Sequence, residues 1–331
     1  MTTPSRVAAP SLAALQAPVR AELEAVYGEI ARIVATDVRQ IREVSAHLLR
    51  LKGKLFRPTL VLLSAQATGA SSKEDVTLAA IVELIHVATL VHDDSVDHSP
   101  LRRGQPTVNA LFSHQIAVIM GDYLYSRAIV ELARLGDLDA LRVMSRVTNE
   151  MTVGEMRQLE AHDVLTYSEE QYDALIRAKT ASLMSAACDI GALHAEDRVR
   201  EPLRRFGLSL GMAFQVTDDV LDYTESERVT GKPSGLDLKE HKITLPLIAA
   251  LPRMSAGERS TVERLMAEPV PGDGLVSQVI AIVAARGGVT AARERAAALA
   301  VEAELELDVL PPSAPRDALR QCLVYAVERR R

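Results

Sequence analysis

The sequence has little of several residue types that mark particular protein classes. Only two of its 331 residues are cysteine, Cys188 and Cys322, too few for a disulfide framework and without the spacing of a zinc site. We therefore expect both to be small buried hydrophobic residues, and we predict a reducing, cytoplasmic location. Aromatic residues make up 3% of the chain and tryptophan is absent. Ala, Leu and Glu are frequent instead, which is typical of a helical protein.

Excess basic charge and long apolar runs are also missing. The formal net charge is −6, whereas a nucleic-acid-binding protein needs a clustered basic surface, so we predict no nucleic-acid partner. The longest apolar stretch, residues 76–91, is interrupted by Glu83 and His86 and is shorter than the roughly 20 residues of a transmembrane helix. The N-terminus lacks the apolar core of a secretory signal. We expect residues 1–11 to be a flexible lead-in and any membrane contact to be peripheral.

Apolar residues at helical spacing run along most of the chain, with no convincing run of alternating strand residues. Glycines such as Gly69 and Gly136 suit helix ends, and prolines divide the last third of the chain. The polar, glycine-rich stretch 224–242 is long for a loop inside a compact domain, so we predict a functional lid there. Helices are predicted at residues 17–34, 41–51, 57–67, 73–95, 107–135, 138–162, 168–193, 199–223, 244–251, 256–267, 274–286, 289–309 and 314–329.

One acidic pattern occurs twice in apolar helical surroundings, as DDSVD from Asp93 and as DDVLD from Asp218. Residues i and i+4 lie on the same face of a helix, so Asp93 pairs with Asp97 and Asp218 pairs with Asp222. The almost wholly apolar segment 78–91 indicates a buried helix, in which paired carboxylates need a metal or basic partners. The alternative is that both clusters are solvated faces of amphipathic helices, which the apolar context opposes.

The two aspartate clusters offer only oxygen ligands, and this determines which metal is expected. Carboxylates without nearby His-Cys pairs suit Mg²⁺ or Mn²⁺, and Mg²⁺ usually takes substrate phosphates in its remaining positions. The two acidic patterns therefore predict a phosphate-bearing substrate. Basic residues suited to phosphate are spread among them: Lys54, Arg57, Arg102, Arg103, Lys179, Lys232 and Lys242.

With these motifs in this order, the chain resembles the trans-isoprenyl diphosphate synthase (polyprenyl synthetase) family over nearly its whole length. The motifs are GKLFRP, IVELIHVATLVHDDSVD, LRRGQPTVN, GDYLYSRA, GEMRQLE, KTASL, FQVTDDVLD and GKPSGLDLKEHKITLP. The resemblance implies an all-α fold of isoprenoid synthase type, in which residues 1–331 form a single-domain bundle of helices around a large central cavity. It also implies a homodimer, for which the apolar stretch 116–132 is a candidate face.

The implied activity is that of a transferase. It would condense isopentenyl diphosphate with an allylic prenyl diphosphate, head to tail and all-trans, to make a polyprenyl diphosphate. The metal and the protein's cations would neutralise the allylic diphosphate, which then leaves. The departed diphosphate would later act as the base that removes a proton. No residue pattern for a covalent nucleophile is present, and none is needed.

The resemblance also assigns roles to individual residues. The expected ligands of Mg²⁺, for which Mn²⁺ can substitute, are Asp93, Asp94, Asp97, Asp218, Asp219 and Asp222. The expected contacts of the allylic diphosphate are Arg102, Lys179, Gln215 and Lys232, with Lys242 as the second lid lysine. The expected contacts of isopentenyl diphosphate are Lys54, Arg57, His86 and Arg103, with the final Arg329, Arg330 and Arg331 closing over it. Thr180 would lie beside the reacting carbons, and the catalytic set is Asp93, Asp94, Asp97, Lys179, Thr180, Asp218 and Lys232.

His86 is a lone histidine on an apolar helix, and such a residue is more often a satisfied core residue than a ligand contact. It lies seven residues before Asp93, which is two helical turns along the same face. We therefore predict that His86 faces the substrate cavity.

Product length is expected to depend on what blocks the hydrocarbon tunnel below the first aspartate cluster. The residues one turn before Asp93 are Ala88 and Thr89, both small, whereas short-chain members of the family carry an aromatic residue there. The chain thus resembles long-chain synthases. The tunnel floor is expected among Ile81, Leu84 and Ile85 or in the facing stretch 116–124, but the sequence does not assign it.

Three other activities stay open at this point: a geranylgeranyl or farnesyl diphosphate synthase, a terpene cyclase, and a regulatory subunit of a two-component synthase. The duplicated acidic pattern with Lys54, Arg57 and Arg103 favours condensation over cyclisation, and a silent subunit is expected to lose its aspartates. Lys52 and His241 stand where the family commonly has glycine, and Pro100 replaces an acidic residue, but none of these removes a predicted ligand. The preferred primer, final chain length, oligomeric state and downstream pathway (quinone, carotenoid or lipid carrier) are not fixed by the sequence.

Overall fold

The structure is a computed structural model that describes residues 10–51, 53–102, 104–160, 163–224 and 235–328. Its first half contains α1 (Leu12–Leu15), η1 (Ala17–Val19), α2 (Arg20–Ile33), α3 (Arg39–Arg50), α4 (Phe56–Thr68), α5 (Asp75–Val96), β1 (Leu101–Arg102), β2 (Gln105–Pro106), α6 (Val108–Leu111), α7 (His114–Leu135) and α8 (Leu138–Gln158). Its second half contains α9 (Glu169–Ile176), η2 (Arg177–Ala181), α10 (Ser182–Gly191), α11 (Asp197–Thr224), α13 (Leu236–Lys239), α14 (Leu245–Ala250), η3 (Leu251–Arg253), α15 (Ala256–Ala267), α16 (Asp273–Ala285), α17 (Gly288–Glu306), η4 (Leu307–Val309) and α18 (Ala314–Glu328).

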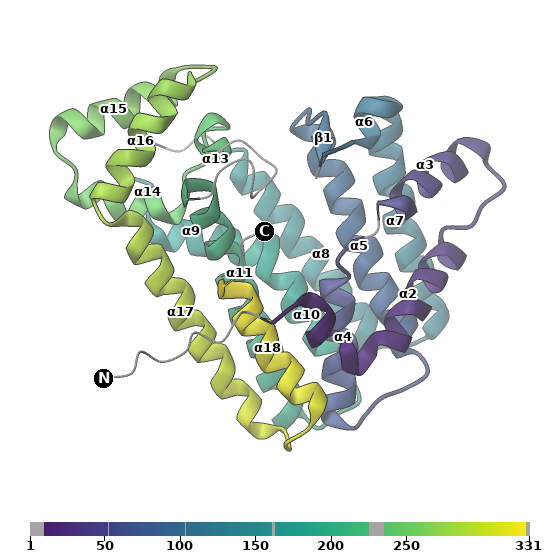
Figure 1. Cartoon of the computed structure of the whole chain (residues 1–331). Helices are drawn as coiled ribbons and strands as arrows, with labels where there is room; N and C mark the ends of the chain where they lie inside the picture. The colour runs from purple at the N-terminus through teal and green to yellow at the C-terminus, as the bar shows by residue number, and fades with distance from the viewer. Residues whose placement is uncertain (1–9, 52, 103, 161–162, 225–234, 329–331) are drawn as a thin grey trace.

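The all-α fold is confirmed, with several departures from the predicted helices (Figure 1). The stretch 107–135 is divided at Ser113, whose extended backbone and side-chain oxygen cap α7 by accepting a hydrogen bond from the Ile116 amide. The stretch 168–193 is interrupted by η2, a π-helical turn. In addition, β1 and β2 pair antiparallel as a two-residue hairpin, too short to give an alternating sequence pattern.

Two clusters of buried apolar residues form the interior, and α11 contributes to both of them. Leu203, Phe206 and Leu210 pack in the cluster built by α2, α4, α5, α7 and α10, whereas Val216 and Val220 pack in the cluster built by α9 and α14–α17. Helix α10 packs against both α5 and α11. The single domain stays a prediction, which this shared helix favours.

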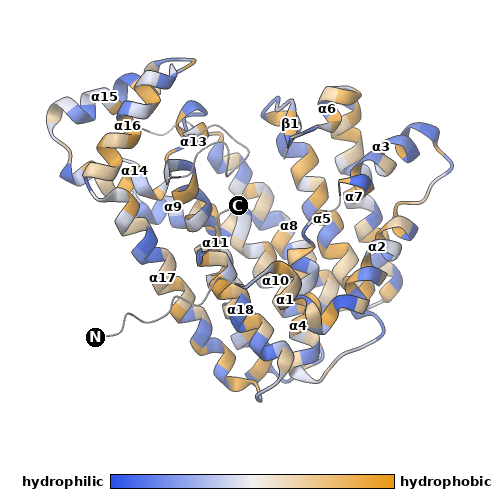
Figure 2. Cartoon of the chain, in the orientation of Figure 1, coloured by the Kyte–Doolittle hydropathy of each residue, from blue (hydrophilic) through white to orange (hydrophobic). Residues whose placement is uncertain are grey.

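Helix α5 is the most apolar long helix of the first half, as Figure 2 shows. By length and composition it could cross a membrane, as could the bent pair α16 and α17 if counted as one span; no other described helix could. However, 61% of the apolar window of α5 is buried inside the protein, and a buried core helix meets the same criteria. Peripheral membrane contact stays a prediction.

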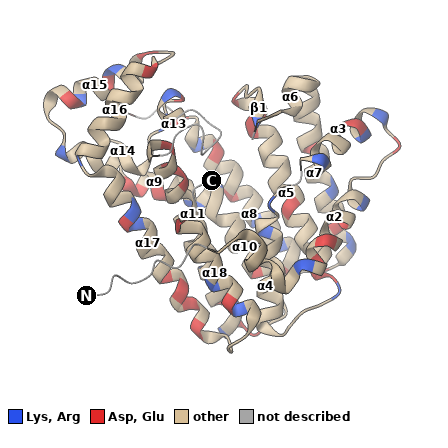
Figure 3. Ribbon diagram, in the orientation of Figure 1, with Lys and Arg blue, Asp and Glu red and all other residues tan. Residues whose placement is uncertain are grey.

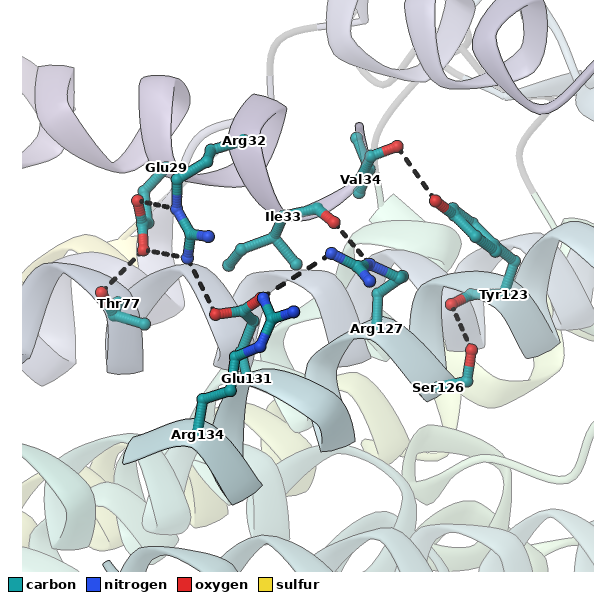
Figure 4. Close-up of polar contacts among 10 residues, drawn as sticks. All are labelled: Glu29, Arg32, Ile33, Val34, Thr77, Tyr123, Ser126, Arg127, Glu131 and Arg134. Carbon is teal, nitrogen blue, oxygen red and sulfur yellow. Dashed lines mark hydrogen bonds and ion pairs between the residues drawn. The ribbon is translucent and has the colours of Figure 1, made fainter. Parts of the chain in front are cut away.

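Charged residues occur on nearly every labelled helix (Figure 3), and Glu131 of α7 is one of those that are buried. Its carboxylate accepts hydrogen bonds from Arg32 of α2 at 2.8 Å and from Arg134 at 2.6 Å (Figure 4). Arg127 and Tyr123 of α7 donate to the carbonyls of Ile33 and Val34, which end α2 without helical partners. These contacts fix α2 against α7.

Both cysteines are fully buried and unpaired, which confirms that they act as small apolar residues. Burial raises the pKa of the Cys188 thiol to about 12, so this thiol is inert near neutral pH.

Candidate active site

The first aspartate cluster lies at the C-terminal end of α5. Asp94 is nearly buried and accepts two hydrogen bonds at 2.9 Å from Nε of Arg102, which lies on the hairpin β1–β2. Asp97 ends the helix and is exposed. Burial raises the pKa of Asp93 to about 6, and the charge of Lys179 offsets only part of that effect. The cluster therefore carries more buried negative charge than its own partners neutralise.

The second aspartate cluster lies at the C-terminal end of α11. Both carboxylate oxygens of the buried Asp219 accept hydrogen bonds, from the Tyr172 hydroxyl at 2.5 Å and from Nε2 of Gln215 at 2.9 Å. Burial, followed by the charge of Asp237, raises the pKa of Asp219 far above its usual range. Asp218 is exposed, and Asp222 accepts from the Leu236 and Asp237 amides. Asp218 is thus the most exposed aspartate of this cluster, whereas both oxygens of Asp219 and of Asp222 accept hydrogen bonds within the protein.

Lys179 and Thr180 lie on the π-helical turn η2, between the two clusters along the chain. Lys179 Nζ lies 2.6 Å from Glu155 and donates to Gln158 at 2.8 Å, both on α8. Thr180 donates to Gln215 Oε1 at 2.9 Å, which links it through Gln215 to Asp219. π-Helical turns are frequent at functional sites, and this one aims two predicted site residues differently from the flanking helices.

Two glycines let neighbouring helices approach this turn. A Cβ added at Gly154 of α8 would lie 2.8 Å from Ala178 Cβ, and one at Gly211 of α11 would lie 2.5 Å from Ala181 Cα. These contacts are too short for any larger residue. Close packing against η2 therefore explains why glycine stands at both positions.

Three of the four residues predicted to contact isopentenyl diphosphate line one cavity of about 1140 Å³. Lys54, Arg57 and His86 face it together with Asp94 and Arg102. Arg57 Nη1 lies 3.0 Å from His86 Nε2, and both side chains line the cavity. That His86 contacts a substrate there stays a prediction. The apolar side of the cavity includes Phe56, which stacks with Phe214 at 5.8 Å between ring centroids and contacts Tyr325 at 5.7 Å.

Several predicted residues lie outside the part of the chain that the structure describes. They are Lys52, Arg103, Lys232, Arg329, Arg330, Arg331 and most of the predicted lid. The described end of that stretch, residues 235–242, is not all loop, because it contains α13. Lys242 Nζ pairs with Glu240 at 2.6 Å. His241 adopts a left-handed backbone with φ of 58° and its ring contacts the Glu268 carbonyl at 2.8 Å, so this position keeps the glycine-like conformation without glycine.

Some partners of the predicted residues were not expected from the sequence. Glu155 and Gln158 belong to a quoted motif without an assigned role, and Tyr172 had no recognisable signal. Asp237 was also missed, although it stands two residues after Gly235 in the GLDLKE segment. Burial and the charge of Asp222 raise its pKa to about 7.

The donor set suits a hard divalent cation that is completed by a substrate. Across the described residues, no three His, Cys, Asp or Glu side chains come together closely enough to hold a metal ion by themselves. Carboxylates such as Asp93, Asp97 and Asp218 can each supply oxygen ligands, and Mg²⁺ or a similar ion commonly takes one or two of these with substrate phosphate oxygens. The six aspartates stay predicted metal ligands, and for Asp219 its two internal hydrogen bonds compete with that role.

Comparison with known proteins identifies the class of this site. A family model described as polyprenyl synthetase matches residues 38–283. The chain is 40% identical over 315 residues to an all-trans-nonaprenyl-diphosphate synthase (geranyl-diphosphate specific) of Rhodobacter capsulatus, covering 95% of this chain and 96% of that one. It is 38% identical to an octaprenyl diphosphate synthase of Escherichia coli (strain K12), covering 89% and 92% of the two chains.

The fold agrees with these matches. A crystal structure of polyprenyl synthase from Caulobacter crescentus, complexed with calcium and isoprenyl diphosphate, superimposes with a TM-score of 0.92 at 34% identity, covering 99% of this chain and all of that one. The protein is therefore a prenyltransferase, an enzyme of the transferase class. Within that class it belongs to the polyprenyl synthetase family, which confirms the resemblance seen in the sequence.

Replacement of Gly211 by alanine tests the packing around η2. The added methyl group meets the Ala181 backbone, so we expect Gly211→Ala to lower the free energy of unfolding by about 1–3 kcal/mol and to lower kcat, because Thr180 and Gln215 move apart. Gly28→Ala is the matched control, since nothing lies within 4 Å of the added Cβ and alanine favours its helix. Thermal unfolding and turnover measure both effects. Equal stabilisation by the two substitutions would show that the approach at Gly211 is not tight.

Proposed function

We propose that this enzyme condenses isopentenyl diphosphate with an allylic prenyl diphosphate, head to tail and all-trans, to make a long-chain polyprenyl diphosphate with Mg²⁺ as its metal. One observation carries the proposal: Lys54, Arg57 and His86 line the same cavity as Asp94 and Arg102. A condensing enzyme needs two adjacent diphosphate sites, and only one of these needs the metal-binding aspartates. The octaprenyl and nonaprenyl synthases among its relatives support a long product.

The metal proposal rests on carboxylate chemistry. The Caulobacter crescentus enzyme, in complex with calcium and isoprenyl diphosphate, supports a divalent cation here as well. Asp93, Asp97 and Asp218 would hold Mg²⁺, with Mn²⁺ as a substitute, because their oxygen donors suit hard cations. When bound, the metal neutralises diphosphate charge and thereby weakens the allylic carbon–oxygen bond.

The protein's own cations complete the allylic site. Arg102 already neutralises Asp94, and Lys179 is paired with Glu155, at 2.6 Å. A bound diphosphate, with more negative charge than one carboxylate, would draw Lys179 away from Glu155. Gln215 of α11 and Lys242, which follows α13, are further predicted contacts of this diphosphate. The positive groups thus stabilise charge on the leaving diphosphate as the allylic bond breaks.

The second half of the reaction takes place beside the apolar wall. Lys54, Arg57 and His86 hold isopentenyl diphosphate, so that its double bond attacks the allylic carbocation and a new carbon–carbon bond forms. A proton then passes to the departed diphosphate, which is the nearest strong acceptor. Phe56 and Phe214 exclude water from the cavity and so protect the cation from hydrolysis.

The first experiment incubates purified protein with Mg²⁺, labelled isopentenyl diphosphate and either geranyl or farnesyl diphosphate, and then sizes the extracted products. We expect a ladder that ends in a long-chain polyprenyl diphosphate and disappears with a chelator. A product that stops at the farnesyl or geranylgeranyl length would support the short-chain alternative. Consumption of the allylic substrate without incorporation of label would support a terpene cyclase, and no reaction at all would support a regulatory subunit.

Substitution of Ala88 tests where the growing chain lies. Ala88 is buried on α5, while Thr89 is half-buried; neither lines the 1140 Å³ cavity, which lies along the Glu83, Val87 and Asp94 face of the same helix. We expect Ala88→Phe or Thr89→Phe to shorten the product, because a ring would fill a tunnel along this second face. Product sizing and thermal unfolding are measured together. A folded variant with an unchanged product distribution contradicts this placement of the tunnel.

We also propose a homodimer through α7. Val118, Ile119 and Tyr125 are exposed on this helix at 38%, 60% and 38%, and several exposed apolar side chains on one helix are typical of a subunit interface. Light scattering of the purified protein is expected to give twice the chain mass. Ile119→Asp should shift the mass towards the monomer, whereas Val301→Asp, on the exposed face of α17, should not. A monomeric wild-type protein would remove this proposal.

A further inference from the structure

The N-terminal segment before residue 38, where the family match begins, contacts the turn that carries Lys54. In this segment η1 packs against α4, and both α1 and η1 pack against α18. Gln16 stands between α1 and η1 and is half-buried. This segment thus reaches the isopentenyl diphosphate side of the cavity from outside the matched region.

The turn at residues 53–55 has an unfavourable backbone conformation. Leu55 has φ of 47° and ψ of 36°, the left-handed region, and α4 begins immediately after it. A residue other than glycine in this region costs about 1–2 kcal/mol, so surrounding contacts must hold it. Lys54 precedes this residue and Arg57 follows it by two positions, so the turn sets where both cations point.

Each carbonyl of the turn is held by a side chain. The Gly53 carbonyl accepts from the Tyr27 hydroxyl at 3.1 Å, and the Leu55 carbonyl accepts from the Thr59 hydroxyl at 2.7 Å. The Lys54 carbonyl accepts from Nε2 of Gln16 at 2.8 Å. Tyr27 lies on α2 and Thr59 lies on α4, so three separate elements converge on three consecutive residues.

Gln16 uses both hydrogens of its amide nitrogen. The second is donated to the Thr59 hydroxyl oxygen at 2.9 Å, and Thr59 is fully buried. A carbonyl can only accept, and the Thr59 hydrogen is already donated to Leu55. Both partners therefore need a donor, which an NH₂ group supplies and a carboxylate does not.

We propose that Gln16 is a positioning residue for isopentenyl diphosphate. By fixing the Lys54 carbonyl against α4, it holds the left-handed turn and directs the Lys54 ammonium into the cavity, where Nζ lies 3.1 Å from the Tyr325 hydroxyl. This inference rests on the proposed role of Lys54 and Arg57. It adds a residue that touches neither substrate and acts through the backbone of one that does.

The test compares Gln16→Met, which keeps the side-chain length but has no donor, with the wild-type enzyme. We expect the KM for isopentenyl diphosphate to rise about tenfold, in line with the loss of two hydrogen bonds, while the KM for the allylic diphosphate stays unchanged. Gln16→Glu is the second variant in case the first folds poorly, and it should give the same split because a carboxylate cannot donate.

Gln66→Met is the matched control. Nε2 of Gln66 donates to Glu22 at 3.0 Å and ties α4 to α2 at the end of α4 away from the turn. Gln66→Met removes a comparable side-chain contact of α4. We therefore expect it to leave both KM values unchanged even if the melting temperature falls. An equal rise of both KM values in Gln16→Met, or no change in a folded variant, overturns the proposal.

A double-mutant cycle with Lys54→Met shows whether Gln16 acts through Lys54. If it does, Gln16→Met raises the KM for isopentenyl diphosphate much less in the Lys54→Met background than alone. Full additivity contradicts the proposal. A wild-type enzyme that does not incorporate isopentenyl diphosphate would refute the proposed function itself, whereas an active wild type with an unaffected Gln16→Met variant refutes only this inference.

Discussion

The burial of carboxylates is the constraint on which the rest of this structure depends. Burial raises the pKa of Asp93 to about 6 and that of Asp237 to about 7, and it raises the pKa of Asp219 well above its usual range. Negative charge in a weakly polar cavity is stable only beside cations. Arg102 and Lys179 supply part of the positive charge that is needed. A divalent metal, which binds together with the diphosphate, is suited to supply the remainder. The fold keeps α5 and α11 in place by packing α10 against both.

Carboxylates and cations are carried by different kinds of backbone. The aspartates lie on regular helices, where the i, i+4 spacing sets them in pairs. Several of the cations lie where helices are interrupted: Lys54 in a left-handed turn, Arg102 on a two-residue hairpin and Lys179 on a π-helical turn. Arg57, in the first turn of α4, is an exception. Lys242 follows another left-handed residue, His241. An interruption releases a side chain from helical spacing, so several cations from distant segments can converge on one diphosphate.

These irregular turns are stable because distant side chains hold them. Tyr27 and Gln16 bind the turn at Lys54, while Gly154 and Gly211 allow α8 and α11 to close on the π-helical turn. Tyr27 is itself fixed because α2 is tied to α7 by the contacts of Glu131 and Arg127. The contacts that shape the substrate sites thus extend well beyond the residues that touch a substrate.

The helices, the aspartate pairs and most candidate cations could be read from the sequence, because each depends on local spacing that α-helical geometry converts directly into a face. The division at Ser113, the π-helical turn at Lys179 and the left-handed Leu55 could not be read in this way. Nor could the partners Tyr172 of Asp219 and Gln16 of Lys54, which lie 47 and 38 residues away in the chain. The sequence alone therefore determined which groups carry the chemistry, and only the tertiary structure decided how they are aimed, because packing between distant segments sets each interruption.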